Sequence, residues 1–370
     1  TVREFINIEL DDWARFGVDG HFEGRNPWFA YHEWFAEPVG AIVGALPHEI
    51  VVMNSLTTNL HLLMASFYRP TADRFKIVIE ASAFPSDQYA VASQAKFHGF
   101  DPADAVVELG PRDGESVLRT EDIENYLQEH GHQVALVLFG GVNYYTGQAM
   151  DFERITKAGH KAGAKVGFDL AHAAGNLELK LHDWGPDFAA WCSYKYLNSS
   201  PGGVSGMFVH ERRSEAPDLP RFAGWWGNDP STRFEMGPDF YPQKGAAGWQ
   251  LSNAPILAMA AHKASVVLFA EATMPALRKK SVDGTEYLLW LIDQIPTESY
   301  EVITPRDPDA RGGQISIRAL GDGQALHAEL TKAGVICDFR RPDVIRIGFA
   351  PIYNSYEDLW HFAQILRANS

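Results

Sequence analysis

The chain has 370 residues, of which 46% are hydrophobic and 21% are charged, a composition typical of a folded globular protein and unlike that of a disordered one. The formal net charge of −15 disfavours non-specific binding to nucleic acid or to an anionic membrane. No apolar run is long enough to cross a bilayer, and the acidic segment 1–15 is unlike a signal peptide. Because the two cysteines, Cys192 and Cys337, cannot form a disulfide framework, we expect a reducing compartment, namely the cytoplasm.

Short apolar segments alternate with helical patterns through the middle of the chain. Strands are predicted at 75–80, 105–109, 134–139, 164–168, 187–192 and 206–210. Helices are predicted at 85–97, 120–129 and 152–162, the second with Thr120 as its N-cap. The repeated strand–helix–strand order predicts an α/β fold with a mainly parallel sheet, in which ligands bind beyond the carboxyl ends of the strands.

The pattern changes after residue 251. Residues 253–295 are mostly helical, and two half-exposed strands follow at 313–318 and 344–348, with a helix at 324–333 between them. An amphipathic helix at 355–367, with Ser355 as its N-cap, closes the chain. We therefore predict two domains, a large one over 1–255 that includes an N-terminal helical segment, and a smaller α+β domain over 256–370.

Lys195 is the first candidate for chemistry. It follows an apolar strand directly, precedes a glycine-containing turn, and has Trp191, Tyr194 and Tyr196 close by in the sequence. In such surroundings partial desolvation favours a neutral amine, which can form a Schiff base with an aldehyde. A surface lysine that ends a strand is the alternative interpretation.

Asp169 and His172 form the second candidate. Asp169 falls at a strand end, 26 residues before Lys195, and His172 follows three residues later. A buried carboxylate that keeps a pyridine nitrogen protonated is the functional interpretation, since the ring of pyridoxal phosphate (PLP) withdraws electrons only in that state. An N-capping aspartate beside a packed histidine is the alternative.

Two further segments are weaker signals. Asn54–Asn59 precedes an apolar helical pattern at 60–67, so its hydroxyl and backbone N–H groups could bind a phosphate or only cap the helix. In Phe84–Asp87, Phe84 could stack on a cofactor ring, with Ser86 and Asp87 near its polar edge, or Pro85 could simply start a helix. The chain has no Walker or dinucleotide glycine pattern and no metal-binding motif, so we expect no metal.

Three of these segments together resemble the kynureninase family, PLP-dependent hydrolases of fold type I in the aminotransferase class V group. The segments are Cys192–Asn198, Phe168–Ala173 and Phe84–Tyr89. The resemblance covers essentially the whole chain and extends to Leu56–His61, Tyr145–Gln148, Leu181–Trp184, Ser231–Phe234, Ser252–Asn253 and Pro351–Ser355.

The resemblance implies a cofactor site for pyridoxal 5′-phosphate. In it, Lys195 carries the cofactor as a Schiff base, Asp169 pairs with the ring nitrogen, and His172 lies near the 3-hydroxyl edge. The other cofactor contacts that the resemblance implies are Leu56 and Thr57 at the phosphate, helped by Asp87 and Tyr194, with Phe84 stacked on the ring and Pro85 and Ser86 beside it. Gly140 departs from the family pattern, which commonly has serine there, so one cofactor contact is lost or taken by water.

The resemblance also implies the substrate and the reaction. The substrate is L-kynurenine or its 3-hydroxy form, and the products are L-alanine and an anthranilate, a step of tryptophan catabolism and NAD biosynthesis. Freed Lys195 acts as general base, Tyr194 protonates the product carbon, and Arg346 holds the α-carboxylate. His21 lies near the aryl ring and favours the 3-hydroxy substrate together with Asn253.

A homodimer with shared active sites follows from the same resemblance, since Trp225 and Asn253 would come from the second copy. The family also has a segment before the helix that opens this chain, and its absence here argues for a non-catalytic PLP-fold protein as one alternative. Another class V activity, aminotransfer or cysteine desulfuration, is the other, but neither Cys192 nor Cys337 lies on an evident mobile loop.

Overall fold

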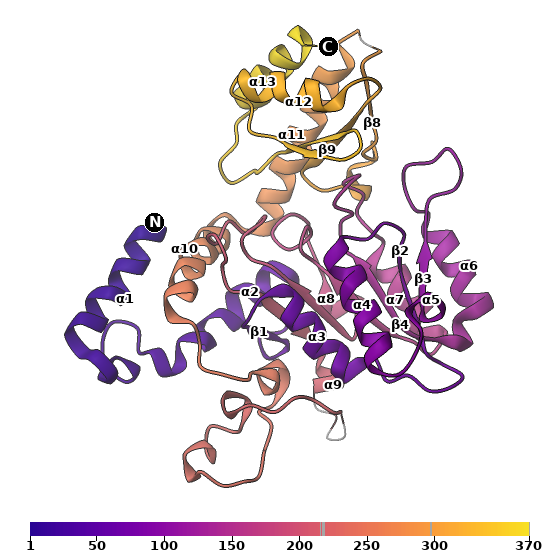
Figure 1. Cartoon of the computed structure of the whole chain (residues 1–370). Coiled ribbons are helices and arrows are strands. Elements are labelled where there is room, and N and C mark those ends of the chain that lie inside the picture. The colour runs from indigo at the N-terminus through magenta and orange to yellow at the C-terminus, as the bar shows by residue number, and fades with distance from the viewer. Residues whose placement is uncertain (215, 217–218, 297, 370) are drawn as a thin grey trace.

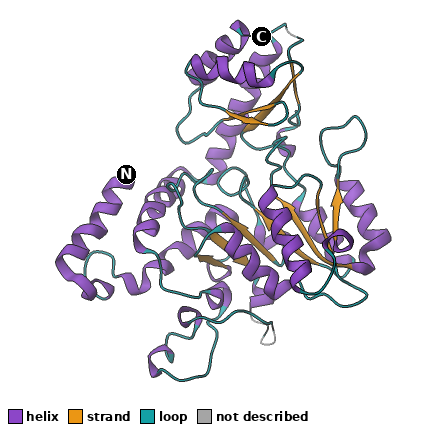
Figure 2. Ribbon diagram, viewed as in Figure 1, coloured by secondary structure: helices purple, strands orange, loops and turns teal. Residues whose placement is uncertain are grey.

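The computed structural model describes residues 1–214, 216, 219–296 and 298–369. A seven-stranded sheet forms the centre of the large domain, in the order β1-β7-β6-β5-β4-β2-β3. The strands from β6 to β3 are parallel, whereas β7 runs antiparallel to both of its neighbours. Helices lie on both faces of this sheet, and a small domain with its own sheet lies at one end (Figures 1 and 2).

The strands of the large sheet are β1 (Ile50–Val52), β2 (Lys76–Glu80), β3 (Val106–Leu109), β4 (Val134–Gly140), β5 (Lys165–Asp169), β6 (Phe188–Trp191) and β7 (Gly206–Val209). The helices that accompany it are α1 (Val2–Phe16), α2 (Ala36–Val43), α3 (Leu56–Phe67), α4 (Pro85–Phe97), α5 (Pro102–Ala105), α6 (Thr120–His130), α7 (Phe152–Lys161), α8 (Leu181–Trp184), α9 (Glu211–Ser214) and α10 (Ile256–Ala272). Helix α1 packs mainly against α10.

The small domain contains an antiparallel sheet in the order β10-β11-β9-β8. Its elements are α11 (Met274–Asp293), β8 (Tyr300–Val302), β9 (Gln314–Ala319), α12 (Gly323–Lys332), β10 (Asp338–Arg340), β11 (Val344–Gly348) and α13 (Tyr356–Ala368). Short 3-10 helices lie at Gly17–His21, Trp28–Phe35, Pro47–Glu49, Gly131–Gln133, Trp225–Gly227, Arg233–Glu235, Gly245–Trp249 and Pro308–Ala310.

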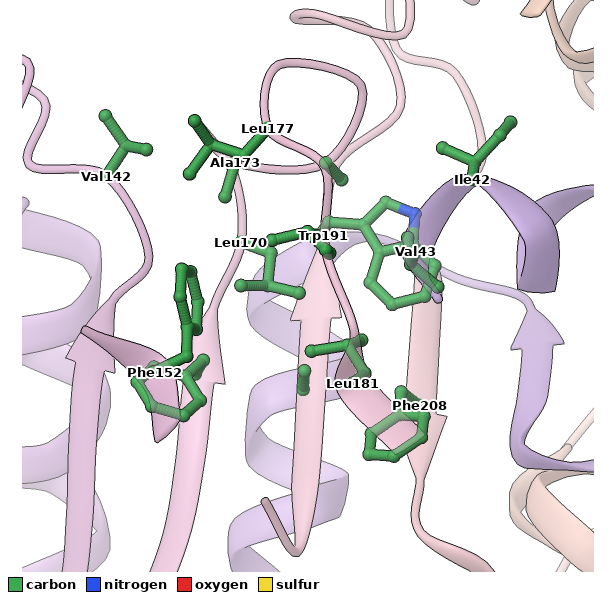
Figure 3. Packing of buried hydrophobic residues seen from close by; sticks show 14 of the residues in the cluster. Ile42, Val43, Val142, Phe152, Leu170, Ala173, Leu177, Leu181, Trp191 and Phe208 are labelled. Atoms are coloured by element: carbon green, nitrogen blue, oxygen red, sulfur yellow. The ribbon is translucent and has the colours of Figure 1, made fainter. Parts of the chain in front are cut away.

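Both faces of the large sheet are buried, which explains why its strands are continuously apolar rather than alternating. On one face Trp191, Leu170 and Phe208 pack with Ile42 and Val43 of α2 (Figure 3). On the other face a separate cluster joins the sheet to α3 and α4. This two-sided burial fixes the strand ends, and with them the positions of the residues that follow.

The predicted fold class is confirmed, and most predicted elements lie within two residues of the observed ones. Ser355 caps α13 with a side-chain hydrogen bond, as predicted. Thr120 is instead the first residue of α6, and Arg119 takes the N-cap position, so that prediction was wrong. The sequence patterns missed β1, β8 and β10, because a three-residue strand is too short to show a period.

The hydrophobic cores divide along α11. Met274 and Leu277 belong to the core of the large domain, whereas Leu288 and Ile292 belong to that of the small one. Helix α10 lies beyond residue 255 but packs with the large core. The domain boundary at residue 255 stays a prediction.

In the part of the chain that the structure describes, no single helix is long and apolar enough to span a membrane. Helices α10 and α11 meet that criterion only as a pair, and they are bent by 81° where they join.

Candidate active site

The carboxyl ends of the parallel strands converge on one cavity of about 230 Å³. Strand β5 ends at Asp169, β4 at Gly140 and β2 at Glu80, and Lys195 lies in the turn beyond β6. All four residues line the cavity, together with Phe84, the residue before α4. This cavity lies beyond the carboxyl ends of the parallel strands, where ligands bind in folds of this class.

The N-terminus of α3 forms one side of this cavity. Leu56 and Thr57 are the first two residues of the helix, and Ser55 precedes them. The Thr57 hydroxyl is hydrogen-bonded to that of Ser86 at 2.8 Å, which joins α3 to the start of α4. Free N–H groups and hydroxyls at the start of a helix suit a phosphate.

Two acids form another side. Asp169 is buried and accepts a hydrogen bond from the backbone N–H of Ala171 at 2.7 Å. Burial raises the pKa of Asp169, whereas this hydrogen bond, one from Asp87 and the charge of Lys195 act against the rise. Burial and the neighbouring Asp169 raise the pKa of Asp87 well above its usual value, so Asp87 carries the proton that the two carboxyls share. Asp169, which accepts the N–H of Ala171, is the better stabilised carboxylate of the pair.

His172 and Phe84 cover the cavity. The Phe84 ring centroid lies 5.5 Å from the Lys195 Nζ, and the ring meets Tyr144 edge-on at 5.4 Å. Burial, with the positive charges of Lys195 and Arg346, lowers the pKa of His172 to about 2. His172 is therefore neutral at physiological pH, and its buried Nδ1 has no hydrogen-bond partner among the described residues.

These groups fit PLP. An amine lies at one side of the cavity, an ionised acid on a neighbouring strand and a phosphate-binding helix start on another side, while Phe84 supplies an aromatic face. His172 Nδ1 and Glu80 Oε2 are buried polar atoms without partners that line the same space. This set of donors and acceptors matches an aldehyde, a pyridine nitrogen and a phosphate on one small ring.

A second cavity, of about 320 Å³, adjoins the first and shares Phe84, His172 and Lys195 with it. Arg346 of β11 lines it and donates a hydrogen bond from Nη1 to the backbone carbonyl of Tyr144 at 2.8 Å. The other Arg346 nitrogen, Nη2, is paired with Asp338, and the buried Nε has no partner. Arg346 thus lies at the wall of the cavity that contains Lys195, with both terminal guanidinium nitrogens hydrogen-bonded to protein groups.

Comparison with known proteins supplies the family. A model of the kynureninase C-terminal domain matches residues 277–366. A kynureninase from Myxococcus xanthus is 58% identical over 99% of this chain and 86% of its own length, and one from Koribacter versatilis is 55% identical over 100% and 87%.

The chain belongs to the kynureninase family.

Solved structures agree on the fold. A cysteine desulfurase from Thermococcus onnurineus NA1 superposes with a TM-score of 0.75 at 16% identity, covering 98% of this chain and 91% of that one. A C-DES variant with glycine covalently linked to its PLP cofactor superposes with a TM-score of 0.80 at 17% identity, covering 99% and 92%. This member of the kynureninase family is accordingly a fold-type I enzyme that uses PLP, as predicted.

The two alternatives, another class V activity (aminotransfer or cysteine desulfuration) and a non-catalytic role, are not favoured, because kynureninases match nearly the whole chain. The thiols also argue against cysteine desulfuration. Burial raises the pKa of the Cys192 thiol and that of the Cys337 thiol. Neither is a ready nucleophile, because the thiolate is the reactive form.

Four predicted residues do not line either cavity of this kynureninase-family chain. His21 Nδ1 lies 3.0 Å from the Val18 carbonyl oxygen, in the segment after α1. Trp225 lines a separate crevice and donates from its indole to the Arg233 carbonyl at 3.1 Å. Asn253 is exposed. Pro85 is the first residue of α4, directly after Phe84.

Sequence reasoning about this kynureninase-family site missed Glu80, Tyr144, Tyr196 and Arg340. Glu80 could have been noticed in the sequence, because it is the last residue of a buried strand and glutamate is rarely buried without a partner. Tyr144 and Arg340 lie in loops or on a short strand, where no periodicity marks a side chain as facing a ligand.

Outside these cavities, Glu49, His182 and His210 place their ligand atoms within 4.8 Å of one another. Glu49 already accepts from the backbone N–H groups of Leu46 and Glu211, each at 2.9 Å, and lies 3.1 Å from His182 Nδ1. The cluster has the hydrogen-bond partners of a structural network, and the expectation of no metal stays a prediction.

Proposed function

We propose that this site hydrolyses L-kynurenine or 3-hydroxy-L-kynurenine to L-alanine and the matching anthranilate, with residue roles as the resemblance implies. The supporting observation is that the cavity with the acid pair and the cavity with Arg346 meet at Lys195. An α-amino acid whose amine reaches Lys195 can thus place its carboxylate at the guanidinium.

PLP, when bound, supplies an electron sink that stabilises negative charge at the substrate α-carbon. Lys195 attaches the cofactor in the resting enzyme and, once free, receives the α-proton on its Nζ. Asp169 holds negative charge beside the ring nitrogen, because Asp87 carries the proton of that pair. Phe84 supplies the ring contact and excludes water from one face.

Arg346 orients the substrate through a planar fork that matches a carboxylate. Tyr194 is the proton donor to the product carbon. Burial, followed by the neighbouring Cys192, raises the pKa of Tyr194 to about 12, so its hydroxyl keeps the proton at neutral pH.

We also propose a homodimer in which the second copy brings Trp225 and Asn253 to the site. Apolar side chains near Trp225 are exposed in the single chain, among them Phe222, Phe234 and Met236. A surface of this kind is typical of one that another protein covers.

Mixing the variants K195A and N253A should restore part of the activity if the dimer forms, because one of the two sites in the mixed dimer is intact. No gain over the separate variants, or a monomer by light scattering, would contradict the dimer.

We also propose that 3-hydroxy-L-kynurenine is the preferred substrate, because the polar side chains of His21 and Asn253 could contact its ring hydroxyl. Comparing kcat/KM for the two substrates tests the preference, and a clear advantage for L-kynurenine would reject it. We propose a cytoplasmic location because the two cysteines are free thiols, which are typical of a reducing compartment, and cell fractionation tests this proposal.

The decisive experiment for the activity is an absorption spectrum of the purified protein with and without L-kynurenine, together with product analysis. We expect a visible cofactor band, alanine and a fluorescent aromatic amine, and in Lys195→Ala a loss of both the band and the turnover. A band without any product from either substrate would leave a PLP-binding protein and refute the proposed hydrolysis.

A further inference from the structure

Glu80 is a buried carboxyl group in the floor of the cofactor cavity. The residue is 5% exposed and ends β2, which lies between β4 and the edge strand β3 in the parallel part of the sheet. Its Oε1 accepts a hydrogen bond from Asn143 Nδ2 at 3.3 Å, and its Oε2 is buried without a partner. Asn143 is itself held by the N–H groups of Tyr145 and Thr146, so it is a fixed donor. One amide N–H is too little to stabilise a buried carboxylate.

The groups that face Glu80 are mostly acids. Asp169 comes from β5, Asp87 from α4, and Lys195, from the turn after β6, supplies the only opposing charge that acts on this cluster within the described residues. Gly140 lies between Glu80 and Asp169, since it pairs with Asp169 and a Cβ on it would lie 3.1 Å from Glu80 Oε1. Three ionised carboxylates around one amine would leave two charges buried without a partner, which is very unfavourable.

We propose that Glu80 is a positioning residue that stays a neutral carboxylic acid, so that the cluster carries a single negative charge and carries it on Asp169. Asp87 holds one proton by its hydrogen bond to Asp169, and Glu80 holds the other. The one remaining negative charge then balances the positive charge of Lys195 in the cofactor-free protein. It lies on Asp169, which pairs with the ring nitrogen in the proposed function, on which this inference rests. Burial is also the main cause that raises the pKa of Glu80 to about 8.

Glu80→Gln separates a neutral acid from a carboxylate, because glutamine keeps the shape and a polar N–H but cannot ionise. The matched control is Glu108→Gln at an exposed position of the neighbouring strand β3. Difference infrared spectra of the cofactor-free protein report the proton directly. Near neutral pH we expect the band of a protonated carboxyl group in the wild type and its partial loss in Glu80→Gln, with no change in Glu108→Gln.

Cofactor affinity and stability give the second readout. The affinity of Glu80→Gln for PLP should lie within about twofold of the wild-type affinity. If Glu80 instead bound the cofactor as a carboxylate, the substitution would lower the affinity at least about tenfold. Because a raised pKa stabilises the fold at low pH, the wild-type apoprotein should lose stability as the pH rises from about 5 through about 8, and Glu80→Gln should lose less. A large loss of affinity in Glu80→Gln, or no difference in the infrared spectra, would overturn the proposal. Failure of the wild type to bind PLP would instead refute the proposed function, since the infrared test needs no cofactor.

Discussion

Asp338 and Arg346 lie directly opposite each other on β10 and β11, and the Arg346 guanidinium is paired with the Asp338 carboxylate. Arg340, two residues after Asp338, donates from its Nε to the same carboxylate oxygen at 3.0 Å. Asp338 thus holds two guanidinium groups at the wall of the cavity that contains Lys195. The substrate carboxylate that we propose to bind here would meet an arginine whose orientation is already fixed by these pairs.

Arg346→Lys should raise KM for the amino-acid substrate by about 10- to 100-fold, because a hydrogen bond to a charged group contributes about 1.5–3 kcal/mol and lysine lacks the planar fork. Steady-state kinetics measure the change. Arg318→Lys, on the adjacent strand β9 and paired with Glu301 at the surface, is the control and should leave KM unchanged. An unaltered KM in Arg346→Lys would remove this residue from the substrate site.

Phe84→Ala should weaken PLP binding by about tenfold or more, since an aromatic contact is worth about 0.5–1.5 kcal/mol beyond the area that it buries. The cofactor's absorbance during dialysis or titration gives the affinity. Tyr89→Ala provides the comparison, because Tyr89 lies on the same helix α4 but is 72% exposed. Equal affinities for the two variants would mean that Phe84 does not contact the ring.

Asp187 supports the sheet below the site and should govern stability in acid. Burial alone would raise the pKa of Asp187, but the hydrogen bond from His160, the N–H of Val166 and the charge of Arg213 outweigh it and lower the pKa to about 2. A lowered pKa stabilises the fold above the ordinary value near 4, and this stability disappears as the pH falls towards about 2.

Asp187→Asn should therefore lower the free energy of unfolding by about 2–3 kcal/mol near neutral pH, because each unit by which the pKa is lowered corresponds to about 1.4 kcal/mol. The loss should shrink as the pH falls from about 4 to about 2. Urea unfolding at a series of pH values measures both effects, and Asp183→Asn, at an exposed position of α8, is the control. A pH-independent difference between wild type and Asp187→Asn would contradict the role of the charge.

Gly167→Ala should destabilise the large domain. Gly167 on β5 is paired with Phe188 on β6, and a Cβ at Gly167 would lie 2.2 Å from two carbons of the Phe188 ring. Both residues are buried, so the strands must separate, and overpacking of this kind costs about 1–3 kcal/mol. Gly321→Ala, where a Cβ has no neighbour within 4 Å, should change the unfolding midpoint little. Similar midpoints for the two variants would show that the sheet absorbs the extra methyl group.

The sequence predicted the parts of the site that follow strongly patterned strands. Lys195 and Asp169 could be found because buried apolar runs lead directly to them, and parallel strands bring their carboxyl ends together. Phe84 could be found because a helix start follows the strand that ends at Glu80. These inferences need only local pattern and one rule of topology.

Other parts of the site depend on contacts that no local pattern contains. Glu80 could be recognised from the sequence only as the last residue of a predicted strand, whereas the groups around it depend on the pairing of β2, β4 and β5, which brings Gly140 and Asp169 beside it. Arg346 was placed by resemblance, since a strand of alternating residues does not say what faces it. Trp225 and Asn253 line neither cavity of the single chain, and the role that the resemblance implies for them depends on the proposed second copy.

Helix α11 packs in the core of the large domain through Leu277 and in the core of the small domain through Leu288. Lys195 lies in the large domain and Arg346 in the small domain. The distance between the Lys195 amine and the Arg346 guanidinium therefore depends on how the two domains are connected, and not on the conformation of a single loop.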